Sequence, residues 1–141
     1  MIGVIVTGHG KYATGMESAL RLLAGRPEKF TAVDFRQEDT IDDLEFRLRD
    51  AILDMSECTG ILIMVDVFEG APFRESVEMK DKMSNLPIEI VTGVNLGMLM
   101  QVNLSRGYVS NVGDLADLAV DEGRKQTLRY VYSESEAESD D

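Results

Sequence analysis

Residues 60–72, GILIMVDVFEGAP, decide the fold class of this chain of 141 residues. Five apolar residues in succession, 61–65, are typical of a parallel strand that is covered on both faces. A short loop follows, and Pro72 predicts the start of a helix over residues 72–83 because proline favours the first helical turn. An apolar strand, a loop and a helix in this order indicate a βαβ unit.

The same order recurs along the chain. Valine- and isoleucine-rich runs predict strands over residues 2–6, 30–34, 60–65 and 88–91. Helices are predicted over residues 13–24, 41–55, 72–83 and 114–124, with a short one after Leu96. Thr40 and Asp43 form a predicted capping box before the second of these helices. Alternation over residues 127–132 predicts a C-terminal edge strand.

These elements predict an α/β fold, a doubly wound and mainly parallel sheet with helices on both faces. Right-handed crossovers leave few possible arrangements, and a common one has the strand order 2-1-3-4. The first and third strands are then neighbours, and a ligand crevice opens at their carboxyl ends. We therefore expect the loop with His9 to lie close to the loop with Asp66.

Composition excludes several classes of function. The formal net charge of −12 argues against nucleic acid and anionic lipid as partners, because both require a basic surface. No apolar run reaches the roughly 20 residues of a membrane span. The start of the chain does not resemble a signal peptide, so we expect a cytoplasmic protein.

Length and charge predict one domain with a tail. Residues 1–132 form the predicted domain, and residues 133–141 form an acidic tail that we expect to be disordered. No cofactor or metal is expected, since one His and one Cys cannot supply a zinc ligand set. Cys58 lies beside an apolar predicted strand, so we expect it to be a structural thiol.

His9 is the candidate for phosphoryl chemistry. Gly8 and Gly10 allow a sharp turn that exposes the imidazole, which can attack phosphorus when one nitrogen is unprotonated. Asp66 is the candidate acceptor that orients the ring. The simpler alternative is that the histidine only fills a turn and the aspartate only caps a loop.

Backbone groups beside His9 are the candidate phosphoryl ligands. Unpaired N–H groups and the helix dipole favour an anion at a helix N-terminus. The predicted phosphoryl-binding residues are Gly10, Val67, Gly70 and Ala71.

A nucleotide-sensing module is the rival hypothesis. Residues 8–13, GHGKYA, satisfy the GxGxxA pattern after a strand and before a helix. Asp34 ends the second predicted strand, as the ribose-binding acid does in proteins that bind NAD. The motif itself does not require His9 or Asp66.

The chain resembles the IIA components of the mannose, sorbose and N-acetylgalactosamine type in the bacterial phosphoenolpyruvate-dependent sugar phosphotransferase system. The similarity covers nearly the whole domain. The residues that carry it are residues 2–10, 13–15 and 32–35, Val65-Asp66, Gly70 with Pro72-Phe73, residues 93–96 with Met98-Leu99, Ala119-Val120 and Gly123-Arg124.

This resemblance implies that His9 accepts a phosphoryl group from the phosphocarrier HPr. It implies that His9 passes the group to a IIB subunit, which phosphorylates sugar entering through membrane IIC and IID subunits. Asp66 is implied to hydrogen-bond the imidazole. A homodimer that exchanges a C-terminal strand is also implied, and here that strand corresponds to residues 127–132.

Two loops depart from the family pattern. The loop after the aspartate usually reads Gly-Gly-Ser/Thr-Pro, whereas this chain has Glu69-Gly70-Ala71-Pro72. Gly97 also stands where the family often has proline. A phosphorylation-impaired paralogue with a regulatory role therefore remains an alternative.

Overall fold

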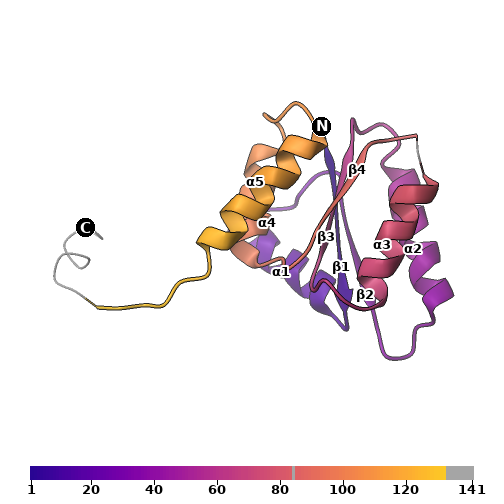
Figure 1. Cartoon of the computed structure of the whole chain (residues 1–141), viewed down its shortest axis with the longest axis horizontal. Coiled ribbons are helices and arrows are strands. Elements are labelled where there is room, and N and C mark those ends of the chain that lie inside the picture. The colour runs from indigo at the N-terminus through magenta and orange to yellow at the C-terminus, as the bar shows by residue number, and fades with distance from the viewer. Residues whose placement is uncertain (84, 133–141) are drawn as a thin grey trace.

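The computed structural model describes residues 1–83 and 85–132, which form four strands and five helices (Figure 1). The strands are β1 (Gly3–His9), β2 (Phe30–Phe35), β3 (Ile61–Val65) and β4 (Ile88–Val91). The helices are α1 (Tyr12–Ala24), α2 (Ile41–Asp54), α3 (Ala71–Lys82), α4 (Leu96–Ser105) and α5 (Val112–Lys125). Every predicted strand from β1 to β4 and every predicted helix is present, with bounds shifted by a few residues.

The sheet is parallel throughout and has the predicted order β2-β1-β3-β4. Helices α2 and α3 cover one face, and α1, α4 and α5 cover the other (Figure 1). The alternate residues of β3 divide between the two faces. Ile61 and Ile63 pack in the core beneath α2 and α3, while Leu62 packs in the opposite core. This double coverage explains the uninterrupted apolar sequence of the strand.

Side-chain caps define where the helices begin. The predicted capping box of α2 is confirmed, since the Thr40 hydroxyl accepts from Asp43 N–H and the Asp43 carboxylate accepts from Thr40 N–H. Helix α3 begins at Ala71, one residue earlier than predicted, with Gly70 as its N-cap. This earlier start brings the helix terminus next to the loop that follows Asp66.

The predicted edge strand over residues 127–132 is not formed within the single chain, which is a correction to the expected fold. The backbone there makes no ladder with the sheet and leaves the body of the molecule beyond α5 (Figure 1). Helix α5 ends at Lys125, and the chain does not return from there to the edge of β4. Exchange of this segment in a dimer stays a prediction. The predicted acidic tail, residues 133–141, lies outside the described residues.

Two further expectations concern the single cysteine and membrane-spanning helices. Cys58 is buried and free, as predicted for a structural thiol. Within the described ranges 1–83 and 85–132, no helix is long and apolar enough to span a bilayer.

Candidate functional site

The structure brings the two predicted loops together at the carboxyl ends of β1 and β3. His9 is the last residue of β1, and Asp66 directly follows β3. His9 Nδ1 lies 2.9 Å from Asp66 Oδ2. The two side chains therefore contact each other across the switch point of the sheet, as the predicted strand order implies.

Asp66 is held in place by donors on both of its carboxylate oxygens. Oδ2 accepts from the His9 backbone N–H at 2.9 Å as well as contacting Nδ1, and Oδ1 accepts from the Val67 N–H at 2.8 Å. A carboxylate can only accept hydrogen bonds, so Nδ1 carries the ring proton in this arrangement. The lone pair is then left on Nε2, which points away from Asp66.

Gly70 leaves the space that the imidazole occupies. Its φ of +93° is in a region that other residues rarely adopt, and a Cβ at this position would lie 2.6 Å from His9 Nε2. The backbone of the α3 N-cap therefore lies directly against His9 Nε2. The glycine is required both for its conformation and for the close approach.

Gly8 has the corresponding role on the other side of the pair. A Cβ on Gly8 would lie 2.8 Å from Asp66 Cγ and 2.5 Å from Tyr12 Cδ1. Tyr12 donates its hydroxyl to the Val94 carbonyl at 2.6 Å. Burial, and then the charge of Asp66, raise the pKa of Tyr12 to about 12. Tyr12 thus ties α1 to the loop after β4 beside Asp66.

Tyr12 and Phe35 are site residues that the sequence analysis did not identify. Phe35 is paired with His9 in the β1–β2 register, and its ring lies edge-on to the imidazole with centroids 6.4 Å apart. The strand alignment could have indicated Phe35, because both residues end adjacent parallel strands. No local signal marks Tyr12, whose hydroxyl partner is distant in sequence.

The four candidate phosphoryl-binding residues separate into two groups. The N–H of Gly10 donates to the Phe35 carbonyl at 2.7 Å, and that of Val67 is bound by Asp66. The N–H groups of Gly70 and Ala71 donate to no protein acceptor in the described part of the chain. Only Gly70 and Ala71 therefore retain backbone donors that are available to an anion.

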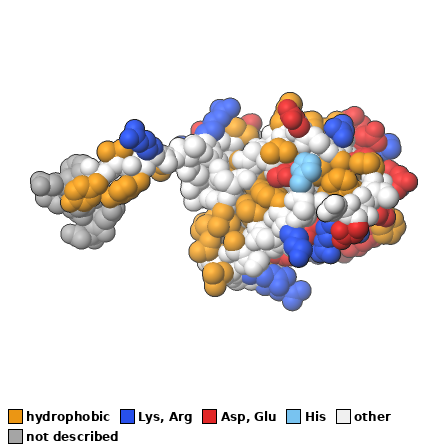
Figure 2. Space-filling view, turned by 90° about the horizontal axis from the view of Figure 1, so that it is seen from below, with side chains coloured by type: hydrophobic (Ala, Val, Ile, Leu, Met, Phe, Trp, Pro, Cys, Tyr) orange, Lys and Arg blue, Asp and Glu red, His pale blue; other side chains and the backbone are white. Residues whose placement is uncertain are grey.

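The pair lies at the molecular surface. The His9 side chain is 48% exposed, whereas that of Asp66 is 12% exposed. Figure 2 shows the pale blue histidine beside carboxylate and apolar side chains on this face. Exposed apolar residues of the adjoining loop are Val67 and Phe68, and the Phe68 ring packs on Phe73 at 4.7 Å between centroids. The imidazole is thus partly accessible on this face, while its partner carboxylate is mostly buried.

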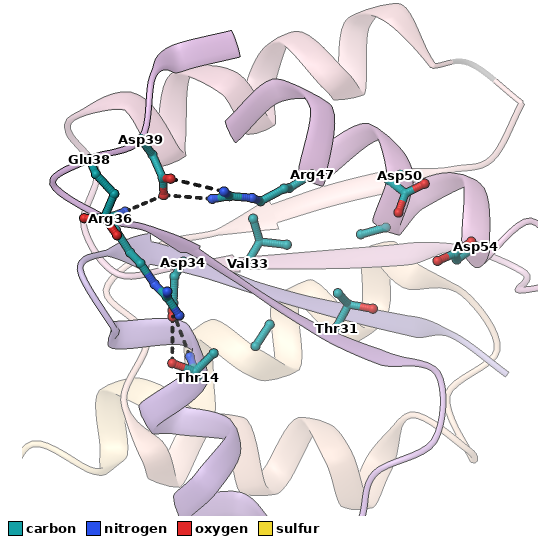
Figure 3. Close-up of a pocket in the computed structure, with 12 residues that line it drawn as sticks. Thr14, Thr31, Val33, Asp34, Arg36, Glu38, Asp39, Arg47, Asp50 and Asp54 are labelled. Carbon is teal, nitrogen blue, oxygen red and sulfur yellow. Dashed lines mark hydrogen bonds and ion pairs between the residues drawn. The ribbon is translucent and has the colours of Figure 1, made fainter. Parts of the chain in front are cut away.

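Asp34 does not have the environment that the nucleotide hypothesis requires. Its carboxylate is buried and accepts from Thr14 N–H at 3.0 Å and from the Thr14 hydroxyl at 2.7 Å. Arg36 lies 3.7 Å away on the same carboxylate. These bonds, visible in Figure 3, leave Asp34 as a structural link between β2 and α1 rather than as a free ribose acceptor.

The cavity beside Asp34 has an acidic lining, with five carboxylates, those of Asp34, Glu38, Asp39, Asp50 and Asp54, against the two guanidinium groups of Arg36 and Arg47. It measures about 570 Å³ and lies along the outer edge of β2 (Figure 3). Arg47 donates to both carboxylate oxygens of Asp39, which lowers the pKa of Asp39. Among the residues that the structure describes, no cluster of three or more His, Cys, Asp or Glu side chains could hold a metal ion.

The fold and the site together define a doubly wound α/β protein with a histidine–aspartate pair at its switch point. Residues 3–120 match the family model EIIA-man, described as "PTS system fructose IIA component". The chain belongs to this EIIA-man family, as the sequence resemblance implied. Membership indicates a role in phosphoryl transfer during sugar uptake.

Individual relatives agree with this assignment. The fructose-specific EIIA component of Bacillus subtilis is 28% identical over 110 residues, which cover 78% of this chain and 74% of that protein. The mannose-specific EIIAB component of Escherichia coli is 24% identical over 88% of this chain, which spans only 38% of that longer protein. The crystal structure of an EIIA component from Streptococcus agalactiae superposes with a TM-score of 0.85 at 29% identity, covering 92% of this chain and 97% of that one.

Proposed function

We propose that this protein is a phosphohistidine carrier in which His9 accepts a phosphoryl group from HPr and passes it to a IIB subunit. The sugar then enters through the membrane IIC and IID subunits, which this chain serves only through IIB. The observation that carries the proposal is the contact of His9 Nδ1 with Asp66 at 2.9 Å, which leaves Nε2 free of Asp66 on a half-exposed side chain.

The transfer step forms a P–N bond on His9. The lone pair of His9 Nε2 attacks phosphorus, and the bond between phosphorus and the donor atom of HPr breaks with its electron pair left on that atom. Asp66 retains the proton on Nδ1 and stabilises the positive charge that develops on the ring. The second transfer, to the IIB subunit, reverses these roles.

The N-terminus of α3 supports the same proposal. Gly70 lies beside Nε2, and the N–H groups of Gly70 and Ala71 have no partner among the described residues. The helix dipole favours negative charge at this N-terminus. These two donors are our candidates for binding the phosphoryl oxygens. Ala71 lacks a hydroxyl, so the backbone has to supply the hydrogen bonds at this position.

The decisive experiment is labelling with radioactive phosphoenolpyruvate, enzyme I and HPr. We expect acid-labile phosphate on the wild-type protein and none on His9→Ala. Because the Asp34 carboxylate is bound by Thr14 and has no part in this mechanism, Asp34→Asn serves as the control and should retain labelling at a temperature where it remains folded. A wild-type protein that takes up no label contradicts the proposal.

Asp66→Asn provides a sharper test of the histidine–aspartate pair. Both carboxylate oxygens face N–H groups, so an asparagine must turn its NH₂ toward a donor whichever way it is oriented. The ring loses its acceptor or changes tautomer, and we expect the labelling rate to fall by at least about tenfold. An unchanged rate in a rapid-quench measurement would mean that Asp66 does not orient His9.

Glu69 and Ala71 keep the regulatory paralogue open as a second candidate, since both differ from the usual family loop. Restoring that loop with Glu69→Gly and Ala71→Ser distinguishes the two functions. A carrier should accept labelled phosphate with its native loop. An impaired paralogue should accept it only after both substitutions.

A homodimer is also proposed, through exchange of residues 127–132. The outer edge of β4 borders a cavity of about 450 Å³ that is lined in part by Phe68, Ile90 and Met98. Leu128, Tyr130, Val131 and Tyr132 are exposed apolar side chains in the single chain. A strand from a second copy would cover both the open edge and these side chains.

A further inference from the structure

The loop beside His9 carries a second carboxylate that the transfer mechanism does not use. A Cβ on Gly70 would lie 2.6 Å from His9 Nε2, so the Gly70 Cα is within about 4 Å of that nitrogen. Consecutive Cα atoms are about 3.8 Å apart, which places the Glu69 Cα within roughly 8 Å of Nε2. Glu69 is exposed, so its backbone lies near enough to Nε2 for its carboxylate to interact electrostatically with a phosphoryl group there.

Glu69 is not neutralised by a neighbouring cation. None of the ion pairs among residues 1–83 and 85–132 involves Glu69, and Arg74 in the first turn of α3 forms none either. The other carboxylate of the site, Asp66, is committed to Nδ1 and to backbone donors. Glu69 thus adds an unpaired negative charge to the loop beside which the phosphoryl dianion has to be accommodated.

We propose that Glu69 sets the phosphoryl-transfer equilibrium of His9, so that phosphorylated His9 is less populated and is a stronger donor to the next acceptor. This inference rests on the proposed function. Repulsion between the carboxylate and the dianion exists only in the phosphorylated state, because the unmodified imidazole is neutral at Nε2. Glu69 therefore raises the free energy of the phosphoprotein alone, and the same energy is released when the P–N bond at Nε2 breaks and the group leaves.

The test is an equilibrium measurement with a defined ratio of phosphorylated to free HPr. Acid-labile phosphate is quantified on wild type, Glu69→Gln, which removes the charge, and Glu69→Asp, which keeps it. We expect Glu69→Gln to raise the equilibrium constant for phosphorylation by about threefold to tenfold at low salt. Glu69→Asp should stay within about twofold of wild type. Glu28→Gln is the matched control, because Glu28 is exposed and precedes β2 at the edge of the sheet opposite His9.

Ionic strength separates a charge effect from a change in loop shape. The Debye length falls from about 30 Å at 0.01 M salt to about 3 Å at 1 M. The ratio between Glu69→Gln and wild type should therefore shrink toward one at high salt. The inference is overturned if Glu69→Gln and wild type have equal equilibrium constants, or if their ratio does not change with salt concentration. It is also overturned if Glu69→Asp raises the constant as much as Glu69→Gln does. Failure of the wild type to accept any label would instead reject the proposed function.

Discussion

Gly70 is the residue on which the geometry of His9 most directly depends. Its φ of +93° and the absent Cβ together allow the α3 N-cap to touch the imidazole. We expect Gly70→Ala to lower the free energy of unfolding by about 1–3 kcal/mol, because the backbone is strained for an L-residue. The labelling rate should fall as well, since the added methyl group has to displace the ring from its position.

Gly10→Ala is the matched control for Gly70→Ala. Gly10 has a φ of +60°, but nothing lies within 4 Å of a Cβ placed there. Its substitution should cost about 1 kcal/mol of stability and leave the labelling rate close to wild type. If both variants label alike, close packing at Gly70 is not what positions His9.

Tyr12 predicts a dependence of stability on alkaline pH. Its pKa is about 12 in the folded protein, against 10.0 for the free side chain. The unfolded chain therefore loses this proton first, so the contribution of Tyr12 is fully present below pH 10.0 and is lost as the pH approaches 12. Urea denaturation of Tyr12→Phe should show a weaker loss of stability over this range than wild type does.

The same variant has a second expected effect near neutral pH. Removing the hydroxyl deletes its bond to the Val94 carbonyl, which should cost about 1 kcal/mol of stability. Identical pH dependence in Tyr12→Phe and wild type would show that another group controls alkaline unfolding.

At the scale of elements, Arg106 joins α4 to the beginnings of β1 and β2. The side chain is buried at the end of α4 and donates to the carbonyls of Ile2, Glu28 and Lys29. Burial lowers the pKa of its guanidinium. These bonds attach the helix to the edge of the sheet opposite the site.

We expect Arg106→Met to lower the free energy of unfolding by about 2–4 kcal/mol, because three carbonyls lose a charged donor while the packed volume is largely retained. Arg106 lies at the start of β1 and His9 at its end, about 20 Å away. Labelling of the folded variant should therefore match wild type. A stability equal to wild type in urea titrations would contradict this role.

At the scale of the whole molecule, the open edge of β4 and the apolar C-terminal segment predict a strand-exchanged dimer. Tyr130 is 80% exposed in the single chain, so a charge placed there should destabilise the dimer and not the fold of the single chain. We expect wild type to sediment as a dimer and Tyr130→Asp to sediment as a monomer. Tyr108→Asp, which alters an even more exposed tyrosine after α4, should remain dimeric. A monomeric wild type excludes the exchange.

Local sequence patterns were sufficient for much of this architecture. The apolar run 61–65 and the spacing of the strands indicated the order β2-β1-β3-β4. Thr40 and Asp43 indicated where α2 begins. Both kinds of signal are readable because periodicity and helix caps act over a few residues. The predicted strand over residues 127–132 failed in the single chain since a strand requires a partner, and no local pattern specifies whether one is available.

His9 and Asp66 could be proposed from the sequence, because the topology of parallel strands brings their loops to one edge. Only the tertiary structure decided which atoms meet: Nδ1 on Asp66, Gly70 against Nε2, and Tyr12 and Phe35 around the pair. It also showed that Gly10 and Val67 use their N–H groups within the protein, while Asp34 is bound by Thr14. Such assignments depend on distances of a few ångströms between residues far apart in the chain, and sequence patterns carry no direct record of these distances.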